Sequence, residues 1–273
     1  MFNQGHFHCL IEGPAMSEYV DYLNVKERNR KGFELNFGSD ISAFQASFSA
    51  LRSIWERLGT TRDVSGQSQV GLLVFANILI RHSIFGFESL VAYQSYLAWS
   101  NFRSGLEALL ILGKLVDDPA NAAVWVNRAT DLKVDRAAYR NAFTGTALES
   151  RSLSRSVDFR KVLTHLNDNF MHPNPSFSYR DTTRIDDGKG VVLSIEFFDL
   201  VPELHEAHVL AYLNLFSLIV EDSSRLVARL CGIANLSGGE NLYEGANRSR
   251  AVQLAASTPE TKKIMEELGL WKL

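Results

Sequence analysis

The sequence predicts an all-α fold, a helical bundle with one small β-hairpin insertion at about 177–198. Three observations lead to this prediction. From residue 41 onward, apolar residues recur at spacings of three and four, which is the period of an amphipathic helix. The segment 69–116 contains no proline, so helices can run through it. Val191, Leu193, Ile195 and Phe197 alternate with Val192, Ser194, Glu196 and Phe198, which is the pattern of a strand.

The chain divides into three expected regions. Residues 1–38 mix glycine, histidine, asparagine and charged residues with little periodicity, so we expect an irregular N-terminal arm. Residues 39–233 form the helical bundle domain with its hairpin. Residues 234–273 are expected to form a C-terminal loop and a short helix packed on the same domain. That helix runs from Thr258, its N-cap, to Leu268.

The first half of the bundle domain contains three expected helices. Asp40 is the expected N-cap of the first, which ends at Gly59. Gly86 and the unusual length of the next apolar segment predict a break, with helices over 69–85 and 88–116. The second of these is apolar nearly all round, which is typical of a helix in the middle of a bundle.

The second half is expected to contain helices on either side of the hairpin. Pro173 and Pro175 stop the helix before them, because proline cannot continue the helical hydrogen bonds. An Asp-Asp-Gly-Lys-Gly run joins the two strands of the hairpin. The expected elements are helices over 120–143, 157–171 and Leu200–Cys231, and strands over 177–185 and 191–198.

Composition narrows the class of protein. The formal net charge of −3 gives no global basic field that would draw the chain to nucleic acid or anionic lipid. The N-terminal residues lack the order of a secretory signal, and the two longest apolar runs, 70–80 and 209–220, are shorter than a membrane span. We therefore expect a cytoplasmic protein without a membrane partner. The common nucleotide, hydrolase and zinc-ribbon motifs are missing, so no cofactor is expected.

Arg103 and Glu107 form the first candidate site. They lie one turn apart on the most apolar expected helix. If their stripe faces the core, the two charges must pair and find further polar partners, and such groups cluster at functional sites. If the stripe faces solvent, they form an ordinary surface ion pair. The sequence leaves both interpretations open.

Arg160 and His165 form the second candidate site. Their Arg-x4-His spacing matches the Arg-x4–6-His motif of HEPN ribonucleases, in which these residues act on RNA. An imidazole can assist proton transfer at a 2′-hydroxyl while a guanidinium holds phosphate. The surrounding stretch, 128–161, carries eight basic residues against four acidic residues. This stretch is either an RNA contact surface or a solvated face.

The remaining histidines do not predict a metal site. His165, Asp168 and His172 share one helix face, but residues seven apart lie about 10 Å apart along the axis of a straight helix. We therefore expect no metal. His205 and His208, at the start of the last long helix, are either surface residues or core histidines with a partner.

Three short motifs carry a resemblance to a known group. Phe102–Glu107 (FRSGLE) precedes an apolar run and then Asp118-Pro119, and Asn169–Asn174 (NFMHPN) follows later. This order resembles a group of bacterial proteins of unknown function that is similar to HEPN-type helical bundles. The group carries an Arg-x3-Glu helix and a later His-Pro motif. The resemblance covers roughly residues 70–230.

The resemblance implies an all-α fold in which Arg103, Glu107 and His172 meet, with His172 hydrogen-bonded to the Glu107 carboxylate. It also implies a homodimer, because HEPN-like bundles often pair. It leaves open whether this set or Arg160 with His165 is the functional one.

Two functions are consistent with these patterns. The first is a HEPN-like protein that binds RNA, or a metal-independent endoribonuclease that uses Arg160 and His165. The resemblance would place this function in a bacterial defence or toxin–antitoxin setting. The alternative is a non-catalytic helical scaffold that binds a partner protein or a small ligand, with Arg103 and Glu107 as structural charges.

Overall fold

A computed structural model of the protein describes residues 15–60, 66–127, 134–168, 182–186, 191–195, 198–199 and 202–232, together with Pro259 and Lys263. In this part of the chain the fold is an all-α bundle, as the sequence predicts. The helices are α1 (Ala15–Asn36), α2 (Gly38–Glu56), α3 (Gln67–Val91), α4 (Ser95–Asp117), α5 (Asn121–Asn127), α6 (Val134–Phe143), α7 (Ser156–Leu166) and α9 (Pro202–Leu230). Two short 3₁₀ turns, η1 (Arg57–Thr60) and η2 (Gly145–Leu148), follow α2 and α6.

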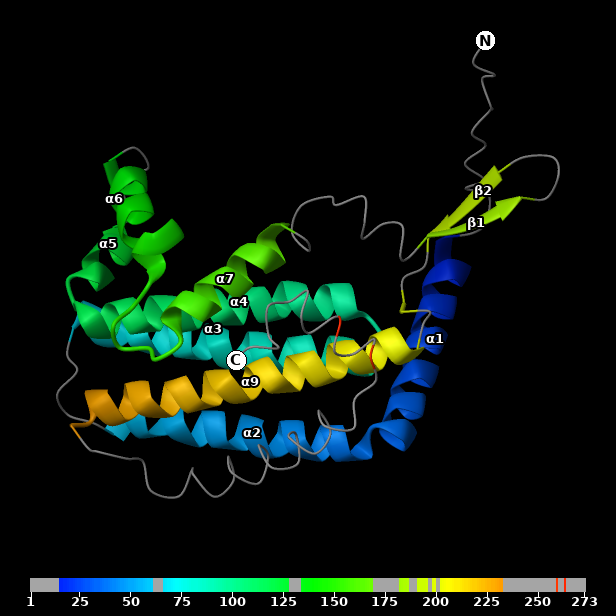
Figure 1. The fold of residues 1–273 in the computed structure, drawn as a ribbon, viewed down its shortest axis with the longest axis horizontal. Helices are drawn as coiled ribbons and strands as arrows, with labels where there is room; N and C mark the ends of the chain where they lie inside the picture. Colours follow the sequence, from blue (N-terminus) through cyan, green and yellow to red (C-terminus); the bar gives the residue numbers. More distant parts are fainter. Residues whose placement is uncertain are drawn as a thin grey trace, which may run out of the picture.

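Helices α2, α3, α4 and α9 lie side by side and form the body of the bundle (Figure 1). The most extensive contacts join α3 to α4, and α2 to α9. Helix α1 crosses one end of the body, α5 and α6 stand at the other end, and α7 lies along α4 (Figure 1). As predicted, α4 is apolar nearly all round and contacts α3, α7 and α9.

The core is unusually aromatic at the α1 end of the bundle. Tyr212 of α9 is fully buried, and its ring contacts Phe87 of α3 and Phe102 of α4. Phe44 of α2 stacks on Phe87 with ring centroids 3.9 Å apart. Large aromatic side chains supply much apolar area for each residue ordered, so this cluster holds the four long helices together.

The expected irregular arm over 1–38 is wrong for Ala15–Asn36, which form α1. Hydrophobic periodicity could not reveal this helix, because its described side chains are mostly polar and exposed. The helix is instead supported by residues of good helix propensity and by opposite charges one turn apart. Two such exposed ion pairs are Lys31–Glu27, at 3.7 Å, and Arg30–Glu34, at 3.5 Å.

The expected break at Gly86 is also wrong. Helix α3 continues past this residue, and the chain turns at Tyr93, which has a positive φ of 61°. Gly86 is required by packing. A Cβ atom there would overlap the hydroxyl of Tyr212 and would lie 3.1 Å from the carbonyl oxygen of Ala98.

Other helix ends differ from the predictions in detail. Asp40 is not an N-cap, because α2 begins at Gly38 and Asp40 lies in its first turn, 6% exposed. Its carboxylate there is favoured by the helix dipole. The described parts of the expected helix over 120–143 are the helices α5 and α6, and residues 128–133 between them lie outside the described part. Helix α7 ends at Leu166 and continues as a π-helical turn over Asn167 and Asp168; residues 169–171 lie outside the described part, so the predicted end of this helix stays a prediction.

Two strands lie within the expected hairpin. β1 (Thr182–Asp186) pairs antiparallel with β2 (Val191–Ile195), with Thr182 opposite Ile195. The hairpin insertion over 177–198 stays a prediction, because residues 177–181, 187–190 and 196–197 lie outside the described part.

One helix of the structure contains a longer apolar segment than the sequence analysis expected. Among the described residues, Ser68–Val91 is long and apolar enough to cross a membrane, with a mean hydropathy of 1.7. The apolar run 70–80 stops before Arg81, but Arg81 does not end the helix, and the apolar part of α3 is therefore longer than this run. The core helix of a bundle meets the same criterion, and α3 packs along α4.

Candidate functional site

Arg103 and Glu107 lie on α4, next to the end of α7. The Arg103 Nη1 atom is 3.1 Å from Glu107 Oε2, and its Nε atom donates a hydrogen bond to Asn167 Oδ1 at 2.7 Å. The two charged side chains are 24% and 30% exposed, so the pair is half-buried and matches neither the buried pair nor the surface pair that the sequence allowed. His172 lies outside the described residues, and its contact with Glu107 stays a prediction.

Arg160 and His165 both lie on α7 but leave it in different directions. Residues five apart on an α-helix point about 140° away from each other. The Arg160 guanidinium is turned toward Glu149, with Nε 2.5 Å from Oε1. His165 is half-buried. The Arg160 guanidinium of this candidate site is therefore already paired with a carboxylate.

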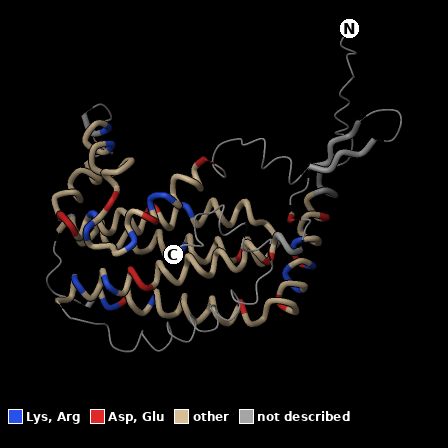
Figure 2. Tube along the Cα trace, in the orientation of Figure 1, with Lys and Arg blue, Asp and Glu red and all other residues tan. Residues whose placement is uncertain are grey.

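The basic stretch between Arg128 and Lys161 is partly neutralised. Three of its cations form ion pairs: Arg155 with Glu221 and Asp222, Arg160 with Glu149, and Lys161 with Asp158. Three others, Arg136, Arg140 and Arg151, are exposed. Arg128 and Lys133 lie outside the described residues. Lys, Arg, Asp and Glu also alternate along α1, at the other end of the bundle (Figure 2).

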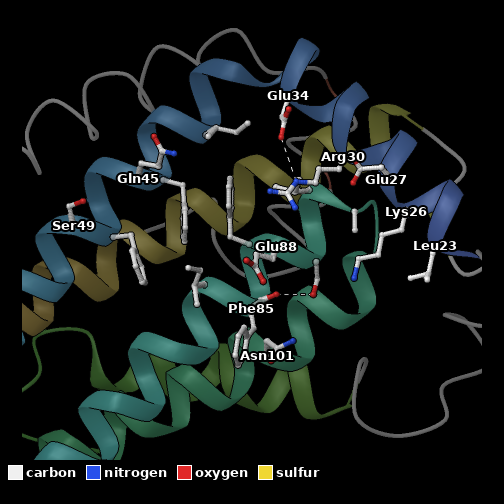
Figure 3. A pocket seen from close by; sticks show the side chains of 18 residues that line it. Leu23, Lys26, Glu27, Arg30, Glu34, Gln45, Ser49, Phe85, Glu88 and Asn101 are labelled. Carbon is white, nitrogen blue, oxygen red and sulfur yellow. Dashed lines mark hydrogen bonds and ion pairs between the residues drawn. The ribbon is translucent and has the colours of Figure 1, made fainter.

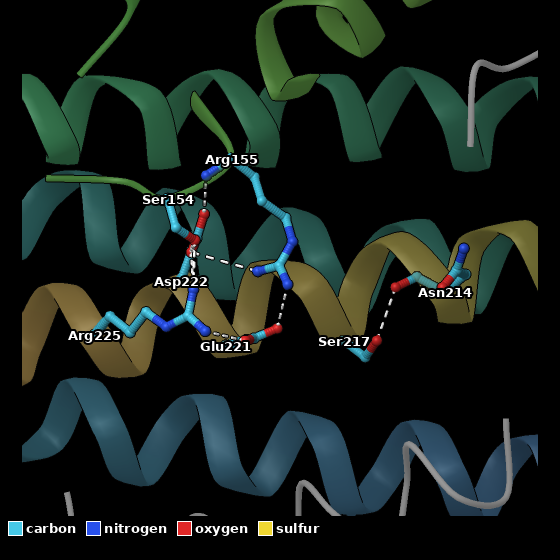
Figure 4. Close-up of polar contacts among 7 residues, drawn as sticks. All are labelled: Ser154, Arg155, Asn214, Ser217, Glu221, Asp222 and Arg225. Carbon is cyan, nitrogen blue, oxygen red and sulfur yellow. Dashed lines mark hydrogen bonds and ion pairs between the residues drawn. The ribbon is translucent and has the colours of Figure 1, made fainter. Parts of the chain in front are cut away.

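A buried ionic network holds the segment before α7 against α9 (Figure 4). Asp222 is fully buried and accepts hydrogen bonds from the Ser154 hydroxyl and from the Arg155 backbone N–H, the latter at 3.1 Å. The Arg155 guanidinium lies 2.8 Å from Glu221. Arg225 also pairs with Glu221 and donates to Ser154. Each buried charge has an opposite charge beside it, which is the arrangement that makes burial tolerable. We interpret this network as a structural clamp.

A second buried polar cluster joins the α3–α4 turn to the start of α9. The Asp199 carboxylate accepts hydrogen bonds from the Ser95 N–H, at 3.2 Å, and the Ser95 hydroxyl, at 2.7 Å, so it caps α4. The same carboxylate lies 2.7 Å from His205 Nδ1. The His205 ring is fully buried and stacks on Tyr93 at 4.0 Å. Burial and the neighbouring negative charge of Asp199 raise the pKa of Tyr93.

His208 lies one turn further along α9 and is also buried. The Trp99 indole N–H donates to His208 Nδ1 at 3.0 Å. Because an indole nitrogen can only donate, His208 Nδ1 is the acceptor, and the ring proton of the neutral form is on Nε2. His205 and His208 are therefore core histidines with partners, one of the two alternatives that the sequence allowed. The sequence could not identify those partners, which come from α4 and from the segment before α9.

A groove between α1, α2 and α3 is a feature that the sequence did not predict (Figure 3). Its volume is about 940 Å³, in the range of binding sites in proteins. Apolar side chains of α2 and α3 form its floor: Ile41, Phe44, Phe48, Phe85, Phe87 and Val91. Two of the apolar residues that line it, Leu23 and Phe85, are 43% and 42% exposed.

The groove has a charged rim. Helix α1 contributes Lys26, Glu27, Arg30 and Glu34, and α3 contributes Glu88 from the opposite side. Arg30 is paired with Glu34, whereas neither Lys26 nor Glu88 forms an ion pair with another described residue. The groove thus combines a largely aromatic floor with Lys26 on one wall and Glu88 on another, neither of them ion-paired within the described part of the chain.

No group of three or more metal-ligating side chains occurs among the residues that the structure describes. The chain was compared with protein-family models, with curated proteins and with solved structures, and none of the three comparisons gave a match.

Proposed function

We propose that the protein is a non-catalytic helical scaffold and that it binds an amphipathic helix in the groove between α1, α2 and α3. The proposal places it in the cytoplasm. The observation that carries the proposal is the groove itself, in which Phe85 of the apolar floor is exposed and the rim is charged. A concave site lined by apolar and aromatic side chains with a few polar groups is typical of binding sites.

The spacing of the floor residues favours a helix as the ligand. Phe44 and Phe48 are one turn apart on α2, and on α3 Phe85 of the floor is nearly one turn from Glu88 of the rim. Side chains at these spacings form ridges along a helix, and the ridge of another helix fits between them. Recognition of an amphipathic helix in a hydrophobic groove follows the same rule, with apolar anchors at i, i+4 and i+7.

The charges on the rim favour a ligand that carries both signs. An acidic side chain of the bound helix would face Lys26, and a basic side chain would face Glu88. Partly exposed pairs of this kind add little affinity, but they select one orientation of the helix.

The test is binding of a synthetic, fluorescein-labelled amphipathic helix of about 18 residues, roughly 27 Å long. Fluorescence anisotropy should show saturable binding, and Phe85→Asp should weaken it at least about tenfold, or about 1.4 kcal/mol, because a carboxylate would be desolvated in the floor. The matched control is Val157→Asp on α7, where the apolar side chain is 46% exposed but lies outside the groove. Equal binding by both variants would show that the groove is not the site.

RNA binding is the second candidate function, and one observation favours it. Arg136 and Arg140 lie one turn apart on α6 and are exposed, as is Arg151. Guanidinium groups on one exposed helix face suit a phosphate backbone. The HEPN-like resemblance supports the same candidate, including metal-independent cleavage by Arg160 and His165 and a homodimer.

A further inference from the structure

Tyr93, in the turn between α3 and α4, has a φ of 61°, in the left-handed region that favours glycine and that large side chains rarely adopt. Its N–H donates to the Leu90 carbonyl oxygen at 2.8 Å. The Gln94 N–H donates to the Ser89 carbonyl oxygen at 2.9 Å. These two bonds form a Schellman motif at the end of α3, and Tyr93 occupies the position where glycine is the usual residue. The motif accounts for the left-handed conformation but not for a large aromatic side chain in that position.

The Tyr93 side chain joins α1 to α9. Its ring stacks on the fully buried His205 of α9, with centroids 4.0 Å apart, and packs edge-on against Phe33 of α1 at 6.2 Å. Phe33 also lies edge-on to His205, at 5.8 Å, so the three rings form one cluster. The Tyr93 carbonyl oxygen accepts a hydrogen bond from the Asp199 N–H at 2.7 Å, which ties the turn to the segment before α9. A glycine would form the same turn without the ring contacts.

All three residues of this turn contact α1, each at a different point. Asn29 Nδ2 donates to the Ala92 carbonyl oxygen at 3.4 Å, and Gln94 Nε2 donates to the Tyr22 hydroxyl at 2.9 Å. Both hydrogen bonds are only partly buried, and bonds that water can replace contribute little net stability. We therefore assign the position of α1 mainly to the ring contact of Tyr93.

We propose that Tyr93 is a positioning residue for the groove: its ring holds α1 in place as one wall, and a helix binds tightly in the groove while α1 is held there. This inference rests on the proposed function of the groove. Helix α1 lines the groove with Leu23, Lys26, Glu27, Arg30 and Glu34. Displacement of α1 lowers the fraction of the protein that can bind a helix, and the apparent affinity falls by the same factor. Docking of α1 on the Tyr93 ring and binding in the groove therefore stabilise each other.

The first measurement is the position of α1 in the absence of a ligand. Tyr93→Gly removes the ring and introduces the usual residue of the motif, so the end of α3 is preserved. Tyr93→Phe is the matched control, because it keeps the ring and loses only the hydroxyl. Spin labels are attached at Arg28→Cys on α1 and Ser53→Cys on α2, both exposed, in the full chain with Cys9→Ser and Cys231→Ser. Pulsed dipolar spectroscopy should give a narrow distance distribution for the parent chain and for Tyr93→Phe, and a broad one for Tyr93→Gly.

The second measurement is the affinity of the unlabelled variants for the synthetic amphipathic helix. Tyr93→Gly should weaken binding about tenfold, whereas Tyr93→Phe should stay within about twofold of the parent chain. Phe33→Ala removes the other side of the same contact and should also weaken binding about tenfold. The double variant should bind no more weakly than either single variant, because the contact can be lost only once, whereas independent effects would multiply to about a hundredfold.

Several results would overturn the inference. A narrow distribution in Tyr93→Gly would show that the ring does not position α1, and a broad one in Tyr93→Phe would assign the effect to the hydroxyl. Equal affinity of Tyr93→Gly and the parent chain, or independent losses in the double variant, would show that Tyr93 does not act on the groove through Phe33. If the parent chain does not bind the synthetic helix, the proposed function of the groove is wrong. A broad distribution in Tyr93→Gly alone would in that case still support positioning of α1 by the Tyr93 ring.

Discussion

Gly86 shows how much a single residue can decide in this fold. It lies in the interior of α3, where glycine is an unfavourable residue, yet it faces the buried Tyr212 of α9. The Tyr212 hydroxyl donates to the Ser83 carbonyl oxygen at 2.6 Å, and burial raises the pKa of this hydroxyl. From the sequence, Gly86 predicted a break between two helices. A glycine within a helical pattern is expected both at a break and where another helix approaches closely, and the sequence alone does not separate the two.

Gly86→Ala should therefore destabilise the protein by about 1–3 kcal/mol, since the new methyl group forces Tyr212 out of place. The matched control is Gly105→Ala in α4, where the nearest atoms to a Cβ would lie at 3.6 Å. That variant should be neutral or more stable by up to about 1 kcal/mol, from helix propensity alone. Urea unfolding of both variants is the measurement. In the Tyr212→Phe background Gly86→Ala should cost less stability than in the parent chain, and an equal cost in both backgrounds would contradict the proposed overlap.

At the scale of elements, the ends of helices are held by polar groups far away in the sequence. Asp117, at the end of α4, accepts hydrogen bonds from the Arg151 N–H at 2.8 Å and the Ser152 hydroxyl at 2.6 Å. Burial alone would raise the pKa of this carboxyl. The hydrogen bonds and the charge of Lys114 outweigh burial and hold the pKa below its ordinary value.

Because the pKa of Asp117 is lowered, its contribution to stability at the end of α4 is lost in acid. A carboxyl whose pKa is depressed by folding stabilises the protein fully above its unfolded-state pKa, near 4, and that contribution is lost as pH falls through the folded-state pKa. Asp117→Asn should thus lower the melting temperature at pH 6, and the difference from the parent should shrink toward pH 3. Ser152→Ala, which removes one donor, should show a smaller effect of the same sign. A difference that stays constant with pH would contradict this assignment.

At the scale of the whole molecule, the distribution of charge allows a direct test of the RNA candidate. Arg136→Ala with Arg140→Ala should weaken binding of single-stranded RNA at low salt and lower the slope of its salt dependence by about one per residue. Arg52→Ala on α2 is the control, because this exposed cation pairs with Glu56 at 3.0 Å. No binding at low salt would discard RNA as a ligand. If RNA is cleaved in EDTA, His165→Ala should abolish the cleavage without changing the melting temperature.

The sequence predicted the bundle better than the site. Long helices such as α4 and α9 can be predicted from the sequence, because burial of one face requires apolar residues at spacings of three and four. Helix α1 was missed because it buries little, and the groove was missed with it, since one wall of the groove is α1. The candidate residues Arg103 and Glu107 were found from their spacing. Their partner Asn167 comes from the end of α7, and no spacing within one helix encodes such a contact.

The thin attachment of α1 has a consequence for the dynamics of the protein. Among residues 19–36, Phe33 is the one fully buried side chain, packed edge-on against Phe87 and Tyr93. An element with so few buried contacts opens at a lower free energy than the rest of the fold. Backbone amides of α1 should therefore exchange with deuterium through a local opening, long before those of α4 or α9. A helix bound in the groove would tie this wall to α2 and α3, and the slowing of exchange along α1 would report its arrival without any label.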